Sequence, residues 1–302
     1  MGGPEGVGPA GGGGPPARPA RRQGFRTFRA DVWTCLGLAL ILAGGLAASF
    51  PWALAPFDPT AQDTAQRLQP PLWRDPGGRL HVLGTDHLGR DILSRLVHGA
   101  RVSLVIALVA VAIAGSLGLT LGLGAGYFRG WVDDVVMRAA DVLLALPFIL
   151  LAIALVVVLG PSVGTIIGVL GVTGWVATAR VVRAQALTLR ARDFVAAARA
   201  MGAGHARILA RHLLPNALGP ATVIAALEVG RMILLESALS FLSLGAPPPT
   251  PTWGGMLADG RVYLSSAWWL ATFPGLAILM TVLGINLVGD WLRETLDPKL
   301  AL

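Results

Sequence analysis

Thirty-eight consecutive uncharged residues between Asp141 and Arg180 constrain this chain more than any other feature of its sequence. A second uncharged run, of 28 residues, separates Arg261 from Asp290. A soluble domain needs a charged surface, with roughly 25% charged residues, whereas only 14% are charged here. A membrane-spanning helix needs about 20 apolar residues. The sequence therefore predicts an all-α integral membrane protein.

The longest uncharged run must hold two spans, because its 38 residues would form a helix about 57 Å long, nearly twice the thickness of the hydrocarbon core. Gly160-Pro161-Ser162 is the natural turn between them. Six transmembrane helices are predicted, at residues 32–52, 102–126, 140–159, 163–180, 217–244 and 268–290.

The chain divides into three regions on composition. Residues 1–30, rich in Gly, Pro and Ala, are expected to be a disordered cytoplasmic tail. Residues 31–97 hold the first span and a polar extracytoplasmic loop, and residues 98–302 hold a five-helix core. The end of the loop, Asp86–Arg101, is expected to form a short amphipathic helix at the membrane interface.

The cations predict the orientation in the membrane. With the N-terminus inside, 16 of the 24 Lys and Arg residues lie in inside segments and 7 in outside segments. This excess favours cytoplasmic positions for both termini in a bacterial or archaeal plasma membrane. It also accounts for the net charge of +7 without a nucleic-acid partner.

Several kinds of site are absent from the sequence. The only lysine is Lys299, and Leu300 follows it, so the Gly-Lys-Ser/Thr of a P-loop is missing and this chain is not expected to hydrolyse ATP. No His is followed by Glu, which excludes an HExxH zinc site. Cys35 is the single cysteine, so neither an intrachain disulfide nor a CxxC site is available.

Two weaker patterns were weighed against plainer interpretations. His81, His87 and His98 share the outer loop, but their spacing matches no standard metal-ligand pattern, so no metal site is predicted. Ser162 lies in a G-x-S-x-G sequence typical of hydrolase nucleophiles. Apolar spans flank it on both sides and no His lies nearby in sequence, so a turn is favoured and no catalytic residue is predicted.

Glycines at helical spacing predict close helix packing in two spans. Gly118, Gly122 and Gly126 follow one another at intervals of four residues, with Gly115 one turn earlier. Gly164 and Gly168 are expected to act in the same way in the fourth span. Small residues on one helix face allow a neighbouring backbone to come close.

Charged residues inside the fifth span are candidates for a solute pathway. Glu228, Arg231 and Glu236 are costly at membrane depth unless they face a partner or a wet cavity, and Ser240 is grouped with them. Glu228 and Arg231 are three residues apart and can pair along the helix, so a purely structural pair remains an alternative. An ion-coupled carrier that uses Glu228 and Glu236 as relay carboxylates is a further alternative, although no inverted repeat is evident.

Residues 190–216 form the most informative inside segment. The pattern predicts two short amphipathic helices, broken at Gly202-Ala203-Gly204 and stopped by Pro215. Each carries Arg on one side and Ala, Met, Ile or Leu on the other. Such a segment is expected to dock on a partner, or alternatively to lie on anionic lipid.

This segment resembles the E-A-A-x3-G-x9-I-x-L-P signature of permease subunits of ABC importers. Ala197-Ala198, Gly202 and Leu214-Pro215 align with it. His212 stands where the general signature has Ile, as in the peptide branch. Ala196 stands where the signature has Glu.

Two further stretches are similar to the dipeptide/oligopeptide/nickel permeases. One is Gly84–Arg95 with Gly99-Ala100-Arg101, and the other is Glu236–Gly245 followed by Pro248–Gly254. The resemblance covers residues 31–302. It matches the second of the two non-identical permeases of such importers, the one with a single span before the shared core.

The resemblance implies a type I ABC-importer architecture and a set of partners. They are a second permease subunit, two ATPase subunits that bind ATP and Mg, an extracytoplasmic solute-binding protein and membrane lipid. No cofactor is expected in this chain. The implied cargo is di- or oligopeptides, with nickel, glutathione or oligosaccharides as alternatives.

The resemblance also assigns residues 190–216 as the coupling loop, which would sit in a groove of an ATPase subunit. Its site residues would be Ala196, Ala197, Ala198, Gly202, Gly204, His205, His212, Leu214 and Pro215. ATP-driven closure of the ATPase pair would then rock the third to fifth spans as levers.

Overall fold

The computed structural model describes Gly2 and residues 32–296. The predicted tail, apart from Gly2, and Lys299 lie outside the described residues. The helices are α1 (Val32–Ser49), α2 (Pro51–Leu54), α3 (Ile92–Phe128), α4 (Gly130–Ala145), α5 (Phe148–Leu159), α6 (Val163–Thr173), α7 (Trp175–Arg190), α8 (Asp193–Ala200), α9 (His205–Ile208), α10 (Leu214–Phe241), α11 (Trp253–Gly260) and α12 (Trp269–Leu296). Strands β1 (Trp73–Arg74) and β2 (Leu80–His81) pair antiparallel in the loop between α2 and α3.

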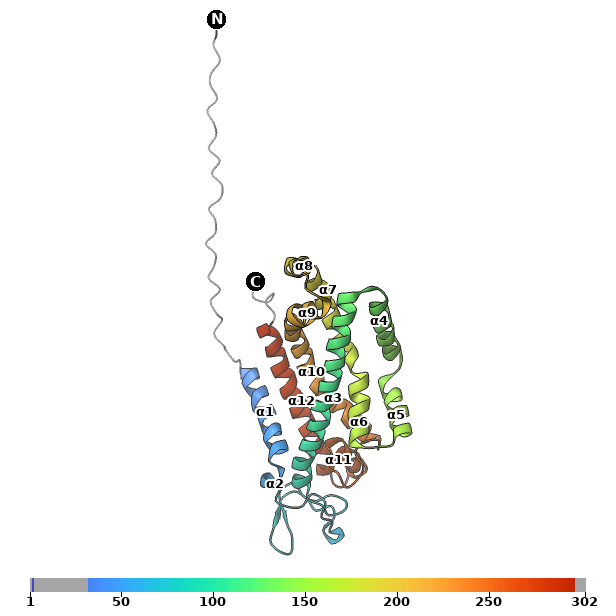
Figure 1. Ribbon diagram of the computed structural model, residues 1–302. Helices are drawn as coiled ribbons and strands as arrows, with labels where there is room; N and C mark the ends of the chain where they lie inside the picture. Colours follow the sequence, from blue (N-terminus) through green and yellow to red (C-terminus); the bar gives the residue numbers. More distant parts are fainter. Residues whose placement is uncertain (1, 3–31, 297–302) are drawn as a thin grey trace.

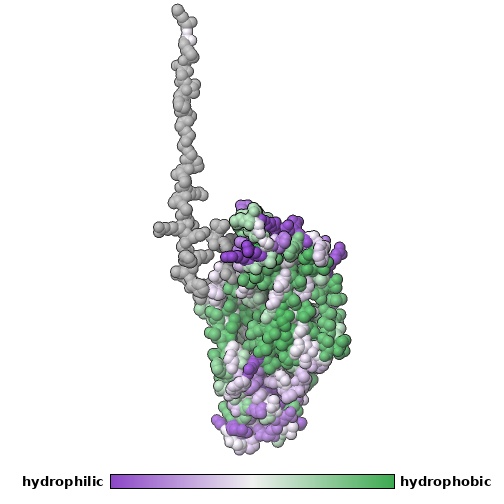
Figure 2. Space-filling view, in the orientation of Figure 1, coloured by the Kyte–Doolittle hydropathy of each residue, from purple (hydrophilic) through white to green (hydrophobic). Residues whose placement is uncertain are grey.

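On the face shown in Figure 2, apolar side chains cover the middle of the bundle and polar side chains gather at its two ends. Five helical segments of the described chain are long and apolar enough to cross a membrane: Val32–Ser49, Ile92–Phe128, Val163–Arg190, His205–Phe241 and Trp269–Thr295. The bent pair α4–α5 makes a sixth if it is counted as one span. The prediction of an all-α membrane protein is therefore confirmed.

The two ends of the bundle differ (Figure 1). The start of α1, the end of α12 and helices α8 and α9 lie at one end, called here the α8 end. The two-stranded sheet and α11 lie at the other, called here the α11 end. The central helix α3 runs between the two ends and packs against α1, α6, α7 and α10.

The predicted interfacial helix at Asp86–Arg101 is wrong. Residues 92–101 are the first turns of α3, which continues without a break to Phe128. The Asp91 carboxylate caps this helix by accepting a 2.7 Å hydrogen bond from the Ser94 backbone N–H. Because no Pro interrupts residues 92–128, the polar start and the apolar span form one 37-residue helix.

The third span also differs from the prediction of residues 140–159. Helix α4 already begins at Gly130, and the chain bends by 92° between α4 and α5. The bend falls at Leu146 and Pro147, where Leu146 is extended with ψ 130°. Pro147 explains this, since a proline ring disfavours the helical conformation of the residue before it.

Three of the predicted packing glycines carry the contact between α3 and α7. A Cβ on Gly118, Gly122 or Gly126 would lie 2.6–2.7 Å from the nearest atoms of α7, which is too close for any real Cβ. For Gly122 the nearest atom is the Ala179 carbonyl oxygen, at 2.6 Å. The glycines therefore allow the backbones of α3 and α7 to touch.

The other predicted packing glycines do not behave in this way within the chain. A Cβ on Gly115 or Gly168 would meet no atom within 4 Å, and one on Gly164 would meet only the nearby Ser162 hydroxyl at 3.8 Å. In the fourth span the close approaches are made instead by Gly171, against Ile113, and by Gly174, against Met232. The four-residue spacing of the glycines did not show which face of each helix packs against a neighbouring helix.

A cluster of ion pairs joins the loop between α2 and α3 to helices α3 and α11. The Asp86 carboxylate accepts a 2.7 Å hydrogen bond from Arg90 Nε and pairs with Arg95. Both arginines also approach Asp259 of α11, with N–O distances of 3.6 and 3.4 Å. Burial alone would raise the pKa of Asp86, but the attraction of Arg95 and Arg90 outweighs it and holds that pKa below its ordinary value.

Replacing Asp86 by asparagine is expected to destabilise the protein by about 2 kcal/mol at neutral pH, because hydrogen bonds to charged groups are lost inside the fold. Thermal unfolding in detergent measures this loss. Because the folded pKa is lowered, the contribution of Asp86 is present at neutral pH and is lost as the pH falls through that pKa. Asp58→Asn, an exposed position in the same loop, is the control and should change the unfolding temperature little. Equal unfolding temperatures for wild type and Asp86→Asn would contradict a stabilising role of the Asp86 carboxylate.

Candidate functional site

The predicted coupling loop begins where α7 ends at Arg190, and α8 follows almost at once. Helix α8 ends in two backbone hydrogen bonds: Ala203 N–H donates to Ala198 O at 3.0 Å, and Gly202 N–H donates to Arg199 O at 2.9 Å. This pair of bonds is the Schellman motif, which needs a left-handed residue just beyond the helix. Gly202 supplies it, with φ +78°.

The two predicted turn glycines play different parts. Gly202 has the positive φ that an L-residue with a side chain adopts only at a cost, whereas Gly204 has φ −68°, open to any residue. A Cβ would meet no atom within 4 Å at either position. The requirement for glycine at position 202 is therefore conformational and not steric.

The prediction that Pro215 stops the second helix is wrong. Helix α9 passes through a π-helical turn, Leu209–Leu213, directly into α10, and Pro215 lies in the first turn of α10. Proline lacks a backbone N–H and its ring would clash with the carbonyl four residues earlier. The wider π turn, in which Leu214 N–H donates to Leu209 O, leads into this position and keeps the chain helical.

One face of the loop is buried against the ends of the long helices. Val195, Ile208 and Leu213 have no exposed surface, and Ala198 is 3% exposed. They pack in one cluster with Leu123, Tyr127, Val182, Ala186, Leu189, Ala217 and Ala221. The loop is therefore an extension of the bundle core and not a segment lying loosely on its surface.

The opposite face of α8 is exposed. Ala196 and Ala197 point outward, next to Phe194 and Met201, whose side chains are 43% and 82% exposed. The loop also carries four exposed arginines: Arg192, Arg199, Arg207 and Arg211. An exposed apolar helix face on a basic segment is typical of a surface that docks in a groove of another protein.

The remaining predicted loop residues lie around this surface. Gly202, Gly204, His205 and Pro215 are exposed, whereas His212 and Leu214 are partly buried. The rings of His212 and Phe194 lie 6.1 Å apart. Ala196 is exposed, so alanine in place of the signature Glu leaves a carboxylate off the outer face of α8 and does not affect the buried face.

The four predicted pathway residues separate into two pairs. Arg231 and Glu228 form an ion pair on α10, with Nη1 of Arg231 3.2 Å from Oε2 of Glu228. The Arg231 side chain is 51% exposed and that of Glu228 is 14% exposed. The neighbouring residues of α10 are apolar, so this ion pair is an isolated charged site on the outer surface of a spanning helix.

Glu236 and Ser240 lie inside the chain, 0% and 4% exposed. The Glu236 carboxylate accepts hydrogen bonds from Ser240 Oγ at 2.7 Å and from Ser103 Oγ of α3 at 3.3 Å. Ser103 Oγ in turn accepts the Trp253 backbone N–H at 3.3 Å. This network joins α10, α3 and α11. That Glu236 and Ser240 lie on a solute pathway stays a prediction.

The weaker patterns also have structural explanations. Ser162 caps α6, where its Oγ accepts the Thr165 N–H at 3.0 Å. His81 Nδ1 lies 2.9 Å from Asp91 Oδ1, the ring of His87 stacks on Tyr263, and His98 Nδ1 lies 2.9 Å from the Ser94 carbonyl oxygen. Among the described residues, no three His, Cys, Asp or Glu side chains are grouped as metal ligands.

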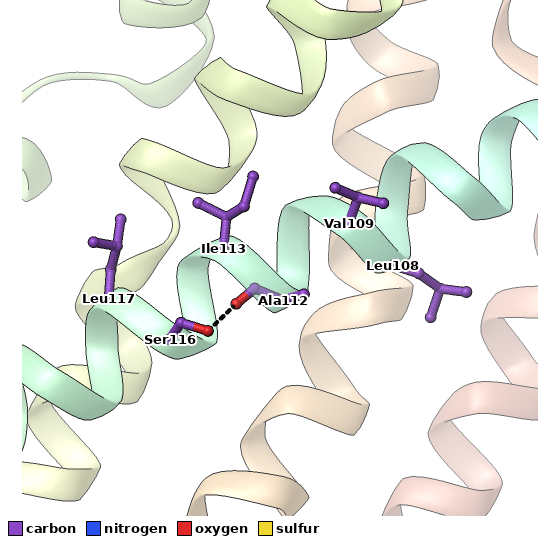
Figure 3. Close-up of a pocket in the computed structure, with 6 residues that line it drawn as sticks. All are labelled: Leu108, Val109, Ala112, Ile113, Ser116 and Leu117. Atoms are coloured by element: carbon purple, nitrogen blue, oxygen red, sulfur yellow. Dashed lines mark hydrogen bonds between the residues drawn. The ribbon is translucent and has the colours of Figure 1, made fainter.

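A shallow groove of about 550 Å³ lies on α3. Figure 3 shows the six residues that line it, all from this one helix: Leu108, Val109, Ala112, Ile113, Ser116 and Leu117. Ser116 has the only polar side chain of the six, and its hydroxyl donates to the Ala112 carbonyl oxygen at 2.6 Å. The groove suits apolar chains and not a charged solute.

Tyr127 is a residue that the sequence analysis missed. It lies at the end of α3, 2% exposed, and its hydroxyl oxygen is 2.8 Å from His205 Nδ1 of the loop. The apolar pattern of α3 hides it, since one tyrosine at a helix end is usual at a membrane interface. Only its distance to the loop, 78 residues away in sequence, indicates its importance.

Comparisons with known proteins agree with this architecture. Residues 118–302 match the family described as binding-protein-dependent transport system inner membrane component. The di/tripeptide transport system permease protein DppC of Pseudomonas aeruginosa is 46% identical over 280 residues, which are 92% of each chain. The dipeptide transport system permease protein DppC of Escherichia coli K12 is 45% identical over 90% of this chain and 91% of its own.

Among solved structures, the MetNI methionine ABC transporter in an inward-facing conformation shares the fold. The similarity has a TM-score of 0.54 at 21% identity and covers 67% of this chain and 96% of the other. Together with the multi-pass helical fold and the loop at the α8 end, these matches establish the family. The chain belongs to the binding-protein-dependent transport system inner membrane components.

Proposed function

We propose that this chain is the permease subunit of an ATP-driven importer of dipeptides. The observation that carries the proposal is the 190–216 loop, which has a buried inner face and an exposed apolar outer face. Such a loop is suited to receive force from a partner and pass it to the bundle. The chain itself performs no covalent chemistry, and it holds no ATP, Mg or other cofactor.

The partner at the α8 end is an ATPase subunit, one of a pair that binds ATP and Mg. The outer face of α8, with Ala196, Ala197 and Met201, enters an apolar groove of that subunit, and the exposed arginines of the loop favour acidic residues on that subunit. The α8 end is then cytoplasmic, as are both termini. The α11 end faces the solute-binding protein on the other side of the membrane.

A second, homologous permease subunit completes the pathway. Helix α5 exposes Leu150, Val157 and Val158 to 63–81%, and α10 exposes Arg231 and Leu234 to about half. An apolar surface of this kind packs against lipid or another permease. The Glu228–Arg231 pair faces this second subunit or the solute between the two.

Dipeptides are the favoured substrate because two relatives that are 46% and 45% identical are named as a di/tripeptide and a dipeptide transport permease. A dipeptide carries an ammonium and a carboxylate group at neutral pH. One carboxylate and one guanidinium at Glu228 and Arg231 match these charges. Nickel, glutathione and oligosaccharides, carried by similar permeases, are the alternatives that the experiment compares.

The experiment is transport by the complete complex, reconstituted into liposomes with its second permease, ATPases and binding protein. We expect accumulation of a radiolabelled dipeptide that requires ATP and is competed by other dipeptides. Glutathione, nickel and a trisaccharide should not compete. Accumulation by this chain alone under a proton or sodium gradient, without ATP, would instead show an ion-coupled carrier.

A further inference from the structure

Tyr127 is bound to the coupling loop through its hydroxyl and its backbone. The hydroxyl lies 2.8 Å from His205 Nδ1, at the start of α9. Its carbonyl oxygen accepts a 2.7 Å hydrogen bond from Arg190 Nη1, at the end of α7. Tyr127 itself is 2% exposed, whereas His205 is exposed and Arg190 is half-buried, so both hydrogen bonds lie at the edge of the buried cluster.

The Tyr127 ring adds contacts to the segment between these two points. The Arg199 guanidinium of α8 lies 5.3 Å from the ring centroid, and that of Arg190 lies 6.0 Å from it. Cations at such distances are attracted to an aromatic ring. One side chain of α3 thus touches α7, α8 and α9 in turn.

Helix α3 is where a force on the loop can spread through the bundle. It packs on α1, α6, α7 and α10, and its glycines hold α7 backbone to backbone. The loop is joined covalently to α7 and α10 and not to α3, which it touches through the apolar cluster that includes Leu123 and Tyr127. The Tyr127–His205 contact is a direct connection from α9 to α3.

We infer that Tyr127 is a positioning residue of the importer, which fastens the coupling loop to α3 so that a displacement of α8 and α9 moves the central helix. This rests on the proposed function of the loop. Without the hydroxyl, α9 slides relative to α3, and ATP hydrolysis proceeds without a matching movement of the spans. A tyrosine that merely fills space would keep its role as phenylalanine.

The experiment compares Tyr127→Phe with wild type in the reconstituted complex and counts ATP molecules hydrolysed per dipeptide imported. We expect this ratio to rise about fivefold, as the loss of one hydrogen bond suggests. Tyr263→Phe is the matched control: it changes the only other tyrosine, which lies directly after α11, and should keep the wild-type ratio. His205→Ala should raise the ratio similarly, and the double variant should raise it no further.

Two results would overturn the inference. One is a wild-type ratio in Tyr127→Phe. The other is an equal fall of uptake and ATP hydrolysis together with a lower unfolding temperature, which marks a purely structural role. If wild type imports no dipeptide, the proposed substrate is wrong. The inference is then tested by the ratio of ATP hydrolysis with the binding protein to ATP hydrolysis without it. Tyr127→Phe should lower this ratio about fivefold by raising the rate without the binding protein, and Tyr263→Phe should keep the wild-type ratio.

Discussion

Valine in place of Gly202 is expected to abolish ATP-driven uptake while the membrane bundle stays folded. Gly202 has φ +78°, and its N–H and that of Ala203 close the end of α8. The left-handed conformation costs an ordinary L-residue about 1–2 kcal/mol, and a β-branched residue more. The turn therefore opens, and α8 no longer presents Ala196 and Ala197 to the ATPase.

Gly204→Val is the matched control for this prediction. Gly204 is two residues away in the same exposed turn, but its φ is −68°, and a Cβ there meets no atom within 4 Å. We expect near-normal uptake for Gly204→Val and at least about a tenfold loss for Gly202→Val, with ATP hydrolysis of the purified complex no longer stimulated by the binding protein. Equal uptake by the two variants would show that the closed turn is not needed for coupling.

The sequence predicted this turn because glycine after an Ala-rich amphipathic stretch is a strong local signal. Helix ends with a left-handed glycine depend on neighbouring residues only, so Gly202 could be placed correctly. The apolar spans were predictable for a similar reason, since the membrane imposes one length and one composition on each of them. The family that these motifs resemble is also the one that the comparisons with known proteins show.

Features that depend on tertiary contacts could not be predicted. The pattern predicted a separate interfacial helix over Asp86–Arg101 and did not show that it continues into the span, because Asp86 and Asp259 pair with Arg95 in the first turns of α3. Glu236 was grouped with Arg231 by depth in the membrane alone. The structure separates them, because Ser103 of α3 and Ser240 bury the carboxylate while Arg231 stays outside.

Leucine in place of Gly122 is expected to prevent correct packing of α3 on α7. A Cβ at this position would already lie 2.6 Å from the Ala179 carbonyl oxygen and 2.9 Å from Val182 Cβ. Neither a backbone atom nor a Cβ can move unless the whole helix moves. Forcing a larger side chain into such a contact costs at least about 3 kcal/mol, which is enough to reduce the yield of folded protein severely.

Gly124→Leu provides the comparison that isolates this contact. Gly124 lies two residues further along α3, and a Cβ there would meet no atom within 4 Å. Leucine also favours a helix over glycine by about 0.8 kcal/mol, so Gly124→Leu should unfold at or above the wild-type temperature in detergent. Gly122→Leu should unfold at a much lower temperature or be recovered only as aggregate. If both variants unfold alike, α3 and α7 do not touch through these glycines. Movement of the coupling loop could then not pass from α7 to α3 through a direct contact between their backbones.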